Sequence, residues 1–322
     1  IELVNSRLAS NIYMMPAAFH KFFRIVLLSC FILLSVIPCN SQNQDSSIYN
    51  PKRGRNLAIG MGATYVAGMT GLYKLWYEGY PSTSFHRFDD KNEWKQMDKF
   101  GHTGSAYYIS RWSSNLVKWT GASTKKSDIT GTGISFVFLT SIEVFDAYSA
   151  NWGFSVSDMI ANTSGCALYL GQQLAWKEQR ITMKFSYSPT DYADYRPDAL
   201  GSTFGERVFK DYNGQTYWLS FNIYSFLNEE SKFPKWLNLA VGYGADGMVT
   251  AYEQVFEIDR VIFPEDERVR QFYISPDIDL NRIKWKSGFM KQFSNVIGFI
   301  KFPLPAVSWD DHGFCKVLPI GF

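Results

Sequence analysis

The sequence predicts an α+β protein, in which an N-terminal bundle of about four helices precedes an antiparallel, strand-rich C-terminal region. Two observations predict this fold class. Up to about residue 178 the chain consists of long apolar segments with small residues at helical spacing, which favours helices. From residue 179 onward apolar and polar side chains alternate in short runs separated by Gly, Pro, Asn and Asp, which is typical of strands joined by turns.

Residues 1–42 are expected to form a leader made of an upstream extension and a signal peptide. Two basic residues precede an apolar run over 25–37, and small or turn-forming residues follow it. This is the layout of a secretory signal. The run is shorter than the roughly 20 apolar residues that a transmembrane helix needs. We therefore expect translation to start at Met14 or Met15 and the mature protein to lie outside the cytoplasm.

Cysteine usage adds one alternative for the leader. A bacterial lipoprotein signal ends at a cysteine that is then acylated, and Cys39 occupies such a position. The preceding residue is Pro38 rather than a small residue, which weakens this prediction. Of the remaining cysteines, Cys166 is expected to be a buried free thiol in a helix. The polar stretch 43–55 is expected to be a linker.

The helical unit is expected to span residues 56–178. Its first helix carries Gly60, Thr64 and Gly68 at four-residue spacing, which lets helix backbones approach closely, especially in lipid. The stretch Thr120–Gly131 is polar and contains glycine, so it is expected to be a loop. The four expected helices are Asn56–Tyr77, Gly101–Trp119, Gly133–Tyr148 and Ser157–Lys177.

The region 179–322 is expected to be β-rich and antiparallel. Asn213-Gly214 is a hairpin-type turn signal. Ser188–Gly205 is rich in Pro, Asp, Tyr and Gly, which indicates a long loop. The alternating segments that we expect to be strands are 182–187, 215–226, 237–243, 272–280 and 296–302.

Alternation of this kind is found both in half-buried soluble sheets and in outer-membrane strands. A minimal closed bacterial barrel uses eight strands, which is more than the pattern provides. An unclosed sheet edge in lipid would leave backbone groups without partners. The sequence therefore favours a sheet packed on the helices, and a partial outer-membrane sheet or barrel is the alternative.

The amino-acid composition limits the kinds of partner that we expect the protein to bind. The chain has 32 basic and 30 acidic residues, so its charge does not indicate nucleic acid. It has 26 Phe, 19 Tyr and 10 Trp, and aromatic residues suit surfaces that are half apolar and half wet. An aromatic-rich soluble sheet has the same composition. We expect membrane lipid or an envelope protein as the partner, at the periplasmic side and associated with the outer membrane.

A glycine-rich segment at 242–247 fits the dinucleotide fingerprint Gly-x-Gly-x-x-Gly. That motif binds nucleotides only inside a strand–helix–strand unit. Its neighbours here are expected to be antiparallel strands, so no nucleotide is expected. The sequence leaves any cofactor or metal open.

Ionisable and amide residues recur at one-turn spacing in three of the predicted helical segments. Asp98 and His102 are four residues apart, Glu143 and Asp146 are three apart, and Asp158 is followed by Asn162. Polar groups in apolar helices cost free energy unless they have partners, so we expect these side chains to meet one another. His102, Glu143 and Asp146 are the candidate catalytic residues, and Asp98, Asp158 and Asn162 are the supporting network.

Each pair also has a purely structural interpretation. Asp98 could cap its helix beside His102, and Glu143 with Asp146 could form a solvated acidic helix end. Asp158 lies in a Ser-x-x-Asp segment that fits a capping box.

The order Asp-Lys-x-x-His, Glu-x-x-Asp and Ser-x-x-Asp-x-x-x-Asn-x-x-Gly resembles the YfiM-like family of predicted periplasmic lipoproteins, and more distantly the VanZ-like membrane proteins. The residues that carry the resemblance lie between about Asp98 and Gln173. They are Asp98, Lys99, His102, Glu143, Asp146, Asp158, Asn162 and Gly165. The resemblance implies a small helical envelope domain without an established activity. The strand-rich region is not found in the short family members.

Two functions from different classes remain open at this point. The first is a non-enzymatic envelope protein with a structural or binding role and a buried His/Glu/Asp/Asn network. The second is a membrane-associated hydrolase of lipid or cell-wall precursors, with His102 and Glu143 or Asp146 as acid, base or ligands. The second requires these side chains to converge within hydrogen-bond distance.

Overall fold

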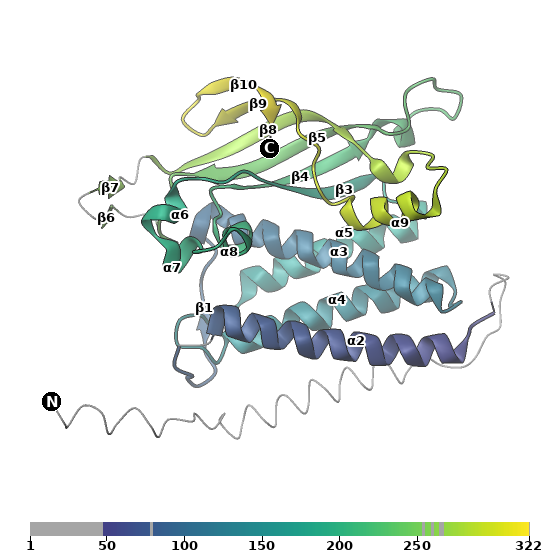
Figure 1. Ribbon diagram of the computed structural model, residues 1–322, viewed down its shortest axis with the longest axis horizontal. Coiled ribbons are helices and arrows are strands. Elements are labelled where there is room, and N and C mark those ends of the chain that lie inside the picture. Colours follow the sequence, from purple (N-terminus) through teal and green to yellow (C-terminus); the bar gives the residue numbers. More distant parts are fainter. Residues whose placement is uncertain (1–47, 78–79, 253–254, 259–260, 264–266, 322) are drawn as a thin grey trace.

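The computed structural model describes residues 48–77, 80–252, 255–258, 261–263 and 267–321. The expected leader and the possible acylation site Cys39 lie outside these residues. The described chain forms two layers, with the helices on one side and a curved antiparallel sheet on the other (Figure 1). The class predicted from the sequence, helices followed by an antiparallel sheet, is confirmed.

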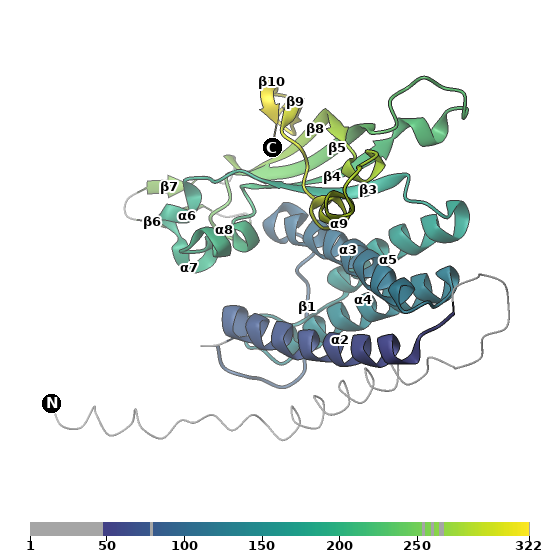
Figure 2. The same cartoon turned by 45° about the vertical axis from the view of Figure 1, so that its right-hand side comes forward.

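Four long helices make up the first layer of the described chain: α2 (Pro51–Leu72), α3 (Met97–Trp119), α4 (Thr124–Asp146) and α5 (Val156–Trp176). A π-helical turn, Tyr73–Tyr77, continues α2. The start of α2 is set by Asn50, whose side chain accepts from the Arg53 N–H at 3.1 Å, and by proline at the first helical position. The helix α3 lies against the sheet in both views, and α2 lies on the far side of the bundle (Figures 1 and 2).

The expected loop Thr120–Gly131 is wrong from Thr124 onward, where α4 already begins. The reason is tertiary. The polar residue Asp128 is buried against neighbouring helices, where its carboxylate pairs with Lys118 Nζ at 2.7 Å and accepts from the Tyr169 hydroxyl at 2.8 Å. The polar sequence therefore suggested a segment that faces solvent. In the structure the Asp128 carboxylate is buried, and its partners on α3 and α5 satisfy it.

Glycines set how closely the helices approach. A Cβ at Gly165 of α5 would lie 2.1 Å from the Thr103 carbonyl oxygen of α3, and one at Gly131 of α4 would lie 2.3 Å from the Ser114 nitrogen. By contrast, a Cβ at Gly60 in α2 would meet nothing within 4 Å. The close approach predicted for the glycines of the first helix is thus made instead by glycines of α4 and α5.

The second layer of the described chain is a six-stranded antiparallel sheet with the order β10-β9-β8-β5-β4-β3. The strands β3 and β10 are its two ends, so the sheet is open rather than a closed barrel. Its strands are β3 (Ile181–Tyr187), β4 (Gln215–Asn222), β5 (Leu237–Asp246), β8 (Val269–Ile278), β9 (Leu304–Asp310) and β10 (Cys315–Gly321).

Smaller elements surround the sheet. Short strands pair outside it, β1 (Arg87–Phe88) with β2 (Phe154–Ser155), and β6 (Phe256–Ile258) with β7 (Val261–Phe263). Short 3-10 segments span Glu93–Gln96, Ile223–Phe226 and Leu280–Arg282. The remaining helices are α6 (Tyr192–Tyr195), α7 (Pro197–Leu200), α8 (Phe204–Lys210) and α9 (Gly288–Ile297).

Three expectations for this region are wrong in whole or in part. The expected strand 215–226 ends at Asn222, and Ile223–Phe226 is a 3-10 turn. The expected loop Ser188–Gly205 contains the short helices α6 and α7 and the start of α8. The segment 296–302 is not a strand: α9 ends at Ile297, and only an isolated parallel bridge joins Ile300 to Phe185. Apolar residues at 289, 293 and 296 have the helical period, which decides against alternation there.

The glycine-rich segment at 242–247 ends β5, which is antiparallel to both of its neighbours, β4 and β8. This arrangement does not have the strand–helix–strand context of a dinucleotide site.

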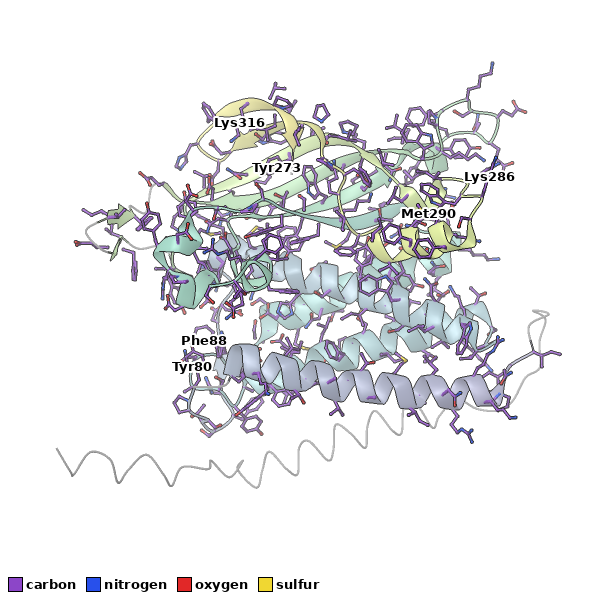
Figure 3. All side chains as sticks on the ribbon, viewed as in Figure 1. Tyr80, Phe88, Tyr273, Lys286, Met290 and Lys316 are labelled. Atoms are coloured by element: carbon purple, nitrogen blue, oxygen red, sulfur yellow. The ribbon has the colours of Figure 1, made fainter. Side chains whose placement is uncertain are left out.

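The concave face of the sheet combines closely paired charged residues with a small buried apolar cluster of Trp218, Ala240 and Tyr273. Lys184 of β3 contacts Asp277 of β8, with Nζ and Oδ2 2.7 Å apart, although two strands lie between them in the sheet. Strands are spaced about 4.8 Å apart, so this contact requires the sheet to curl. Lys301 Nζ lies 3.9 Å from Asp277 Oδ1 and 4.9 Å from the centre of the Trp218 ring. On the same face Tyr273, Ser308 and Lys316 follow one another across β8, β9 and β10 (Figure 3).

Replacing Lys301 by methionine is expected to be better tolerated at pH 7 than at pH 10. Burial, together with the nearby Lys184 charge, lowers the pKa of Lys301 to about 8, despite the opposing effect of Asp277. Between this value and the ordinary lysine pKa the unfolded chain binds more protons, so the wild type gains stability as pH rises through that range. Relative to the wild type, Lys301→Met should therefore be about 1–3 kcal/mol more stable at pH 7 than at pH 10. Urea unfolding of both proteins at both pH values measures this difference. A difference that is independent of pH would contradict the prediction.

The opposite face of the sheet is apolar along a continuous row. In register, this row runs from β3 to β10 through Met183, Leu219, Val241, Ile274, Val307 and Val317. Met183 is buried against Tyr107, Tyr108 and Tyr169 of α3 and α5. Beyond β4 the side chains are exposed: Val241 by 38%, Ile274 by 43% and Val317 by 73%. The helices therefore cover only one end of this row, and β9 and β10 lie farthest from them (Figure 1).

Candidate functional site

The N-terminal turn of α3 carries a lysine surrounded by carboxylates. Lys99 Nζ lies 2.7 Å from Asp98 Oδ2, 2.7 Å from Asp90 Oδ2 and 2.7 Å from Asp158 Oδ1. The lysine side chain is 12% exposed. Ion pairs this short and this shielded satisfy charges that would otherwise be costly to bury.

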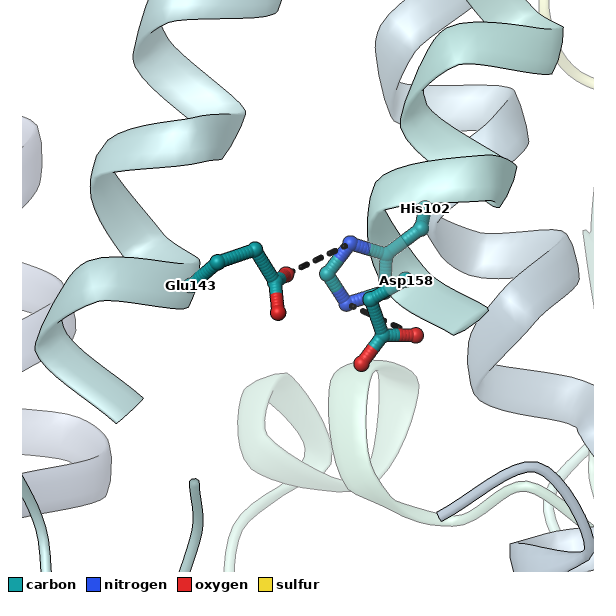
Figure 4. A group of neighbouring side chains, drawn as sticks. All are labelled: His102, Glu143 and Asp158. Atoms are coloured by element: carbon teal, nitrogen blue, oxygen red, sulfur yellow. Dashed lines mark ion pairs between the residues drawn. The ribbon is translucent and has the colours of Figure 1, made fainter. Parts of the chain in front are cut away.

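His102 lies one turn further along α3, between two acidic side chains (Figure 4). Its Nδ1 atom is 3.0 Å from Asn162 Oδ1 and 3.6 Å from Glu143 Oε1. Its Nε2 atom is 3.9 Å from Asp158 Oδ1. The imidazole therefore connects α3 with α4 and α5, and its 22% exposure leaves it partly accessible.

Glu143 is the most deeply buried acid of the group. Its side chain is fully buried, and neither carboxylate oxygen makes a hydrogen bond of ordinary geometry with the described residues. Burial and the charges of Asp158 and Asp146 raise the pKa of Glu143 to about 9, although the backbone of Ser155 offsets part of this rise. The alternative of a solvated acidic helix end is wrong for this residue.

Asp146 does not contact His102 directly. Its Oδ1 accepts a hydrogen bond from the Tyr77 hydroxyl at 2.6 Å. Burial raises the pKa of Asp146 to about 7, against the lowering effects of the Tyr77 hydrogen bond and the His102 charge. Asp146 thus belongs to the same electrostatic cluster as His102 but has its own partner, on the turn that follows α2.

The other acids respond to the same balance of burial and charge. Burial raises the pKa of Asp98 to about 6, although Lys99 opposes the rise. The pKa of Asp158 is also raised by burial, against His102 and Lys99. Burial alone would raise the pKa of Asp90, but hydrogen bonds with Asp158, Lys99 and two serines lower it to about 2. The two neighbouring acids raise the pKa of Lys99 further, against the effect of burial.

The structural interpretation of Asp158 is correct in part. Ser155 is the N-cap residue of α5, and its Oγ accepts from the Asp158 N–H at 3.0 Å. The Asp158 carboxylate, however, points to Lys99 and His102 rather than completing a capping box. The backbone N–H of Asp158 therefore takes part in capping α5, while its carboxylate interacts with Lys99 and His102.

Two residues of the cluster were missed by the sequence analysis. The pairing of β1 with β2 brings Asp90 next to α5, where its Oδ1 accepts from the hydroxyls of Ser155 and Ser157, each at 2.6 Å. Tyr77 lies on the π-helical turn after α2. Neither has a local sequence signal, because both contacts are between segments far apart in the chain.

The turn that leads into α3 is strained and is held by the sheet. Trp94, Lys95 and Gln96 are consecutive non-glycine residues with positive φ values of 48°, 50° and 66°, which is costly. The Tyr243 hydroxyl donates to the Lys95 carbonyl, and Arg270 Nη2 donates to Gln96 Oε1 at 3.2 Å. The sheet thus fixes the turn from which Asp98, Lys99 and His102 project.

The structure therefore brings His102, Glu143, Asp158 and Asn162 together, with Asp98 joined through Lys99. A functional role for these residues stays a prediction. Imidazole and carboxylate groups are ligands for divalent transition metals. The same groups can share protons, because like charges at close range do not all ionise. The complete burial of Glu143 counts against its direct contact with a large substrate.

The described residues form a two-layer protein with a charged centre between α3, α4 and α5. Residues 87–171 match the family described as predicted periplasmic lipoprotein (DUF2279). This match covers about a quarter of the chain and includes Asp90, Asp98, Lys99, His102, Glu143, Asp146, Asp158 and Asn162. It supports an exported protein of unknown activity on the periplasmic side of the envelope. The YfiM-like and VanZ-like resemblances stay predictions.

No curated protein matches the chain significantly. No solved structure matches it significantly either.

Proposed function

We propose that this chain is a non-enzymatic envelope protein that lies on a membrane from the periplasmic side and contacts lipid through its sheet and through α9. In this proposal the charged cluster holds α3, α4 and α5 together and has no direct part in the contact. Association with the outer membrane and processing of a signal peptide belong to the same proposal.

The observation that carries the proposal is the polarity of the sheet. Its concave face holds the Lys184–Asp277 pair and Lys301, which are almost completely buried. Its convex face exposes the apolar row of Val241, Ile274 and their neighbours on β9 and β10. A soluble half-buried sheet has the reverse arrangement, with apolar residues inside and polar residues outside. Lipid favours apolar residues outside and polar residues inside.

The helix α9 has the same inverted polarity. Phe289, Phe293 and Val296, spaced by four and three residues, are exposed by 72%, 42% and 59%. The polar residue Ser294 is only 2% exposed and faces the protein. Lys284, Lys286 and Lys291, all exposed, lie near or on this helix. An apolar stripe bordered by lysines is typical of helices that lie in a membrane interface with anionic lipid.

The length and apolar composition of α4 are compatible with a membrane span and with the core of a soluble protein. Among the described helices, α4 alone is long and apolar enough to cross a membrane, and 39% of its apolar window is buried within the protein. A core helix of a soluble protein meets the same criterion. The helix α4 contributes Leu139 and Glu143 to the buried interior, so it adds no support for membrane contact.

The lipid contact predicts a loss of membrane binding when the exposed face of α9 is made polar. Phe289→Ser combined with Phe293→Ser should lower partitioning to phosphatidylethanolamine–phosphatidylglycerol vesicles at least about tenfold, since burying one such side chain contributes about 1.5–3 kcal/mol. Flotation of the exported, purified chain measures this. All variants carry Cys39→Ala, so that an acyl chain cannot mask the difference.

The matched control removes equally exposed apolar side chains from another surface. Phe209 of α8 and Ile262 of β7 are exposed by 63% and 62%. Phe209→Ser with Ile262→Ser should leave partitioning unchanged. Equal losses in both double variants, or recovery of the Cys39→Ala chain as a freely soluble periplasmic monomer, would refute the proposal.

A further inference from the structure

The orientation of His102 leaves one ring nitrogen directed at an oxygen without a hydrogen bond between them. Nδ1 lies 3.0 Å from Asn162 Oδ1, which is an acceptor, so Nδ1 carries the ring proton of the neutral imidazole. The Nε2 lone pair then points to Asp158 Oδ1 at 3.9 Å. Lys99 Nζ lies 2.7 Å from the same Asp158 oxygen, so one positive charge already stands beside these two acceptors.

Glu143 is an independent observation that points to a ligand. It is fully buried, neither carboxylate oxygen makes a hydrogen bond of ordinary geometry with the described residues, and it is directed at His102 (Figure 4). Leaving a buried carboxylate without partners is costly. A metal ion would satisfy it.

The charges of the cluster also favour a cation. Asp158 interacts electrostatically with each of the other four acids, which are Asp90, Asp98, Asp146 and Glu143. The ion pairs at these acids involve Lys99 and, when it is protonated, His102. Five ionised acids and one permanent positive charge leave four negative charges, of which a divalent ion would balance two.

We propose that His102, Glu143 and Asp158 bind one divalent transition-metal ion between α3, α4 and α5. One ligand atom from each of these residues lies within 4.8 Å of the others, as a shared ion requires. Asn162 is the positioning residue, because its contact with Nδ1 fixes the orientation of the imidazole between Glu143 and Asp158, as hydrogen-bond partners of metal-binding histidines do. This site is independent of the proposed lipid contact.

The donor set selects the class of metal. One imidazole nitrogen with two carboxylates suits Zn²⁺ or Mn²⁺, whereas Ca²⁺ prefers six to eight oxygen ligands. The neighbouring acids Asp90, Asp98 and Asp158 could also surround an ion by distance. Lys99 Nζ already occupies their centre at 2.7 Å from each, so the site is assigned to the His102 side of Asp158.

The test is metal binding to the purified full chain. After removal of metal with a chelator, titration with Zn²⁺ or Mn²⁺ in a calorimeter should give one ion per chain, and the midpoint of thermal unfolding should rise with the ion added. Mg²⁺ and Ca²⁺ at the same concentration should bind at least tenfold more weakly. Failure of Zn²⁺ and Mn²⁺ to bind at millimolar concentration would overturn the proposal.

Two variants locate the site. Glu143→Gln removes a ligand charge, and His102→Gln removes the Nε2 lone pair; each should weaken binding at least tenfold. Asp128→Asn is the matched control, because Asp128 is a buried carboxylate on α4 that pairs with Lys118 and Tyr169 instead. Circular dichroism checks that each variant is folded. Wild-type affinity in both folded site variants, or equal weakening in Asp128→Asn, would also overturn the proposal.

Discussion

Lys99→Met is expected to destabilise the protein by about 3–5 kcal/mol, the cost of removing one partner from a buried ion pair. The lysine Nζ lies 2.7 Å from oxygens of Asp90, Asp98 and Asp158. Methionine fills a similar volume but leaves these carboxylates facing one another without a cation. Urea unfolding at pH 7, followed by circular dichroism, measures the loss.

An exposed lysine pair provides the control for this prediction. Lys91 and Asp89 are paired at 3.0 Å, but their side chains are 64% and 69% exposed. Lys91→Met should therefore cost less than about 1 kcal/mol. Adding Asp98→Asn to Lys99→Met should restore part of the stability, because it removes one of the unpaired charges. If Lys99→Met costs no more than Lys91→Met, the carboxylates are not held by this lysine.

The second large effect is expected from Gly165→Ala, which should destabilise the protein by about 2–4 kcal/mol through overpacking. The added Cβ would lie 2.1 Å from the Thr103 carbonyl oxygen and 2.7 Å from the Ala106 Cβ. The nearest of these atoms is backbone, so the helices α3 and α5 must move apart. Because Thr103 is the residue after His102, this movement also displaces the cluster.

Substitution of another glycine of α5, Gly171, is expected to have the opposite effect on stability. A Cβ at Gly171 meets nothing within 4 Å, so Gly171→Ala should stabilise the protein by up to about 1 kcal/mol through helix propensity. The helix α4 offers a second pair of this kind. A Cβ at Gly131 would lie 2.3 Å from the Ser114 nitrogen, whereas one at Gly133 meets nothing within 4 Å. In thermal and urea unfolding, alanine at Gly165 or Gly131 should therefore lower the stability, whereas alanine at Gly171 or Gly133 should raise it. Equal effects at Gly165 and Gly171 would refute the packing argument.

The sequence predicted most of the regular elements because their periodicity is strong. The helix α5 begins one residue before its expected start, and β3, β4, β5 and β8 fall on the alternating segments. The failures occurred where tertiary contacts reversed a local signal. The buried polar residue Asp128 lies in the start of α4, which the sequence analysis assigned to a loop. At the end of α9, the segment 296–302 was assigned to a strand although Phe289, Phe293 and Val296 have the helical period.

The candidate cluster was predictable in its residues but not in its arrangement. One-turn spacing on three helical segments selected His102, Glu143 and Asp158. The same reasoning undervalued Lys99, which lies at the centre of the carboxylates, because a lysine at a helix start is usually solvated. Asp90 could not be found this way, since only the pairing of β1 with β2 brings it near α5.

The sequence by itself determined the order of helices and strands, because the period of apolar residues is a local property of the chain. It also determined which side chains need partners, since an ionisable group in an apolar helix is costly wherever it lies. Only the tertiary structure decided which partners they find, because glycine contacts between helices and the curl of the sheet bring together residues that are far apart in the chain. The same curl placed polar residues inside the sheet and apolar residues outside, which alternation along a strand cannot distinguish from the reverse.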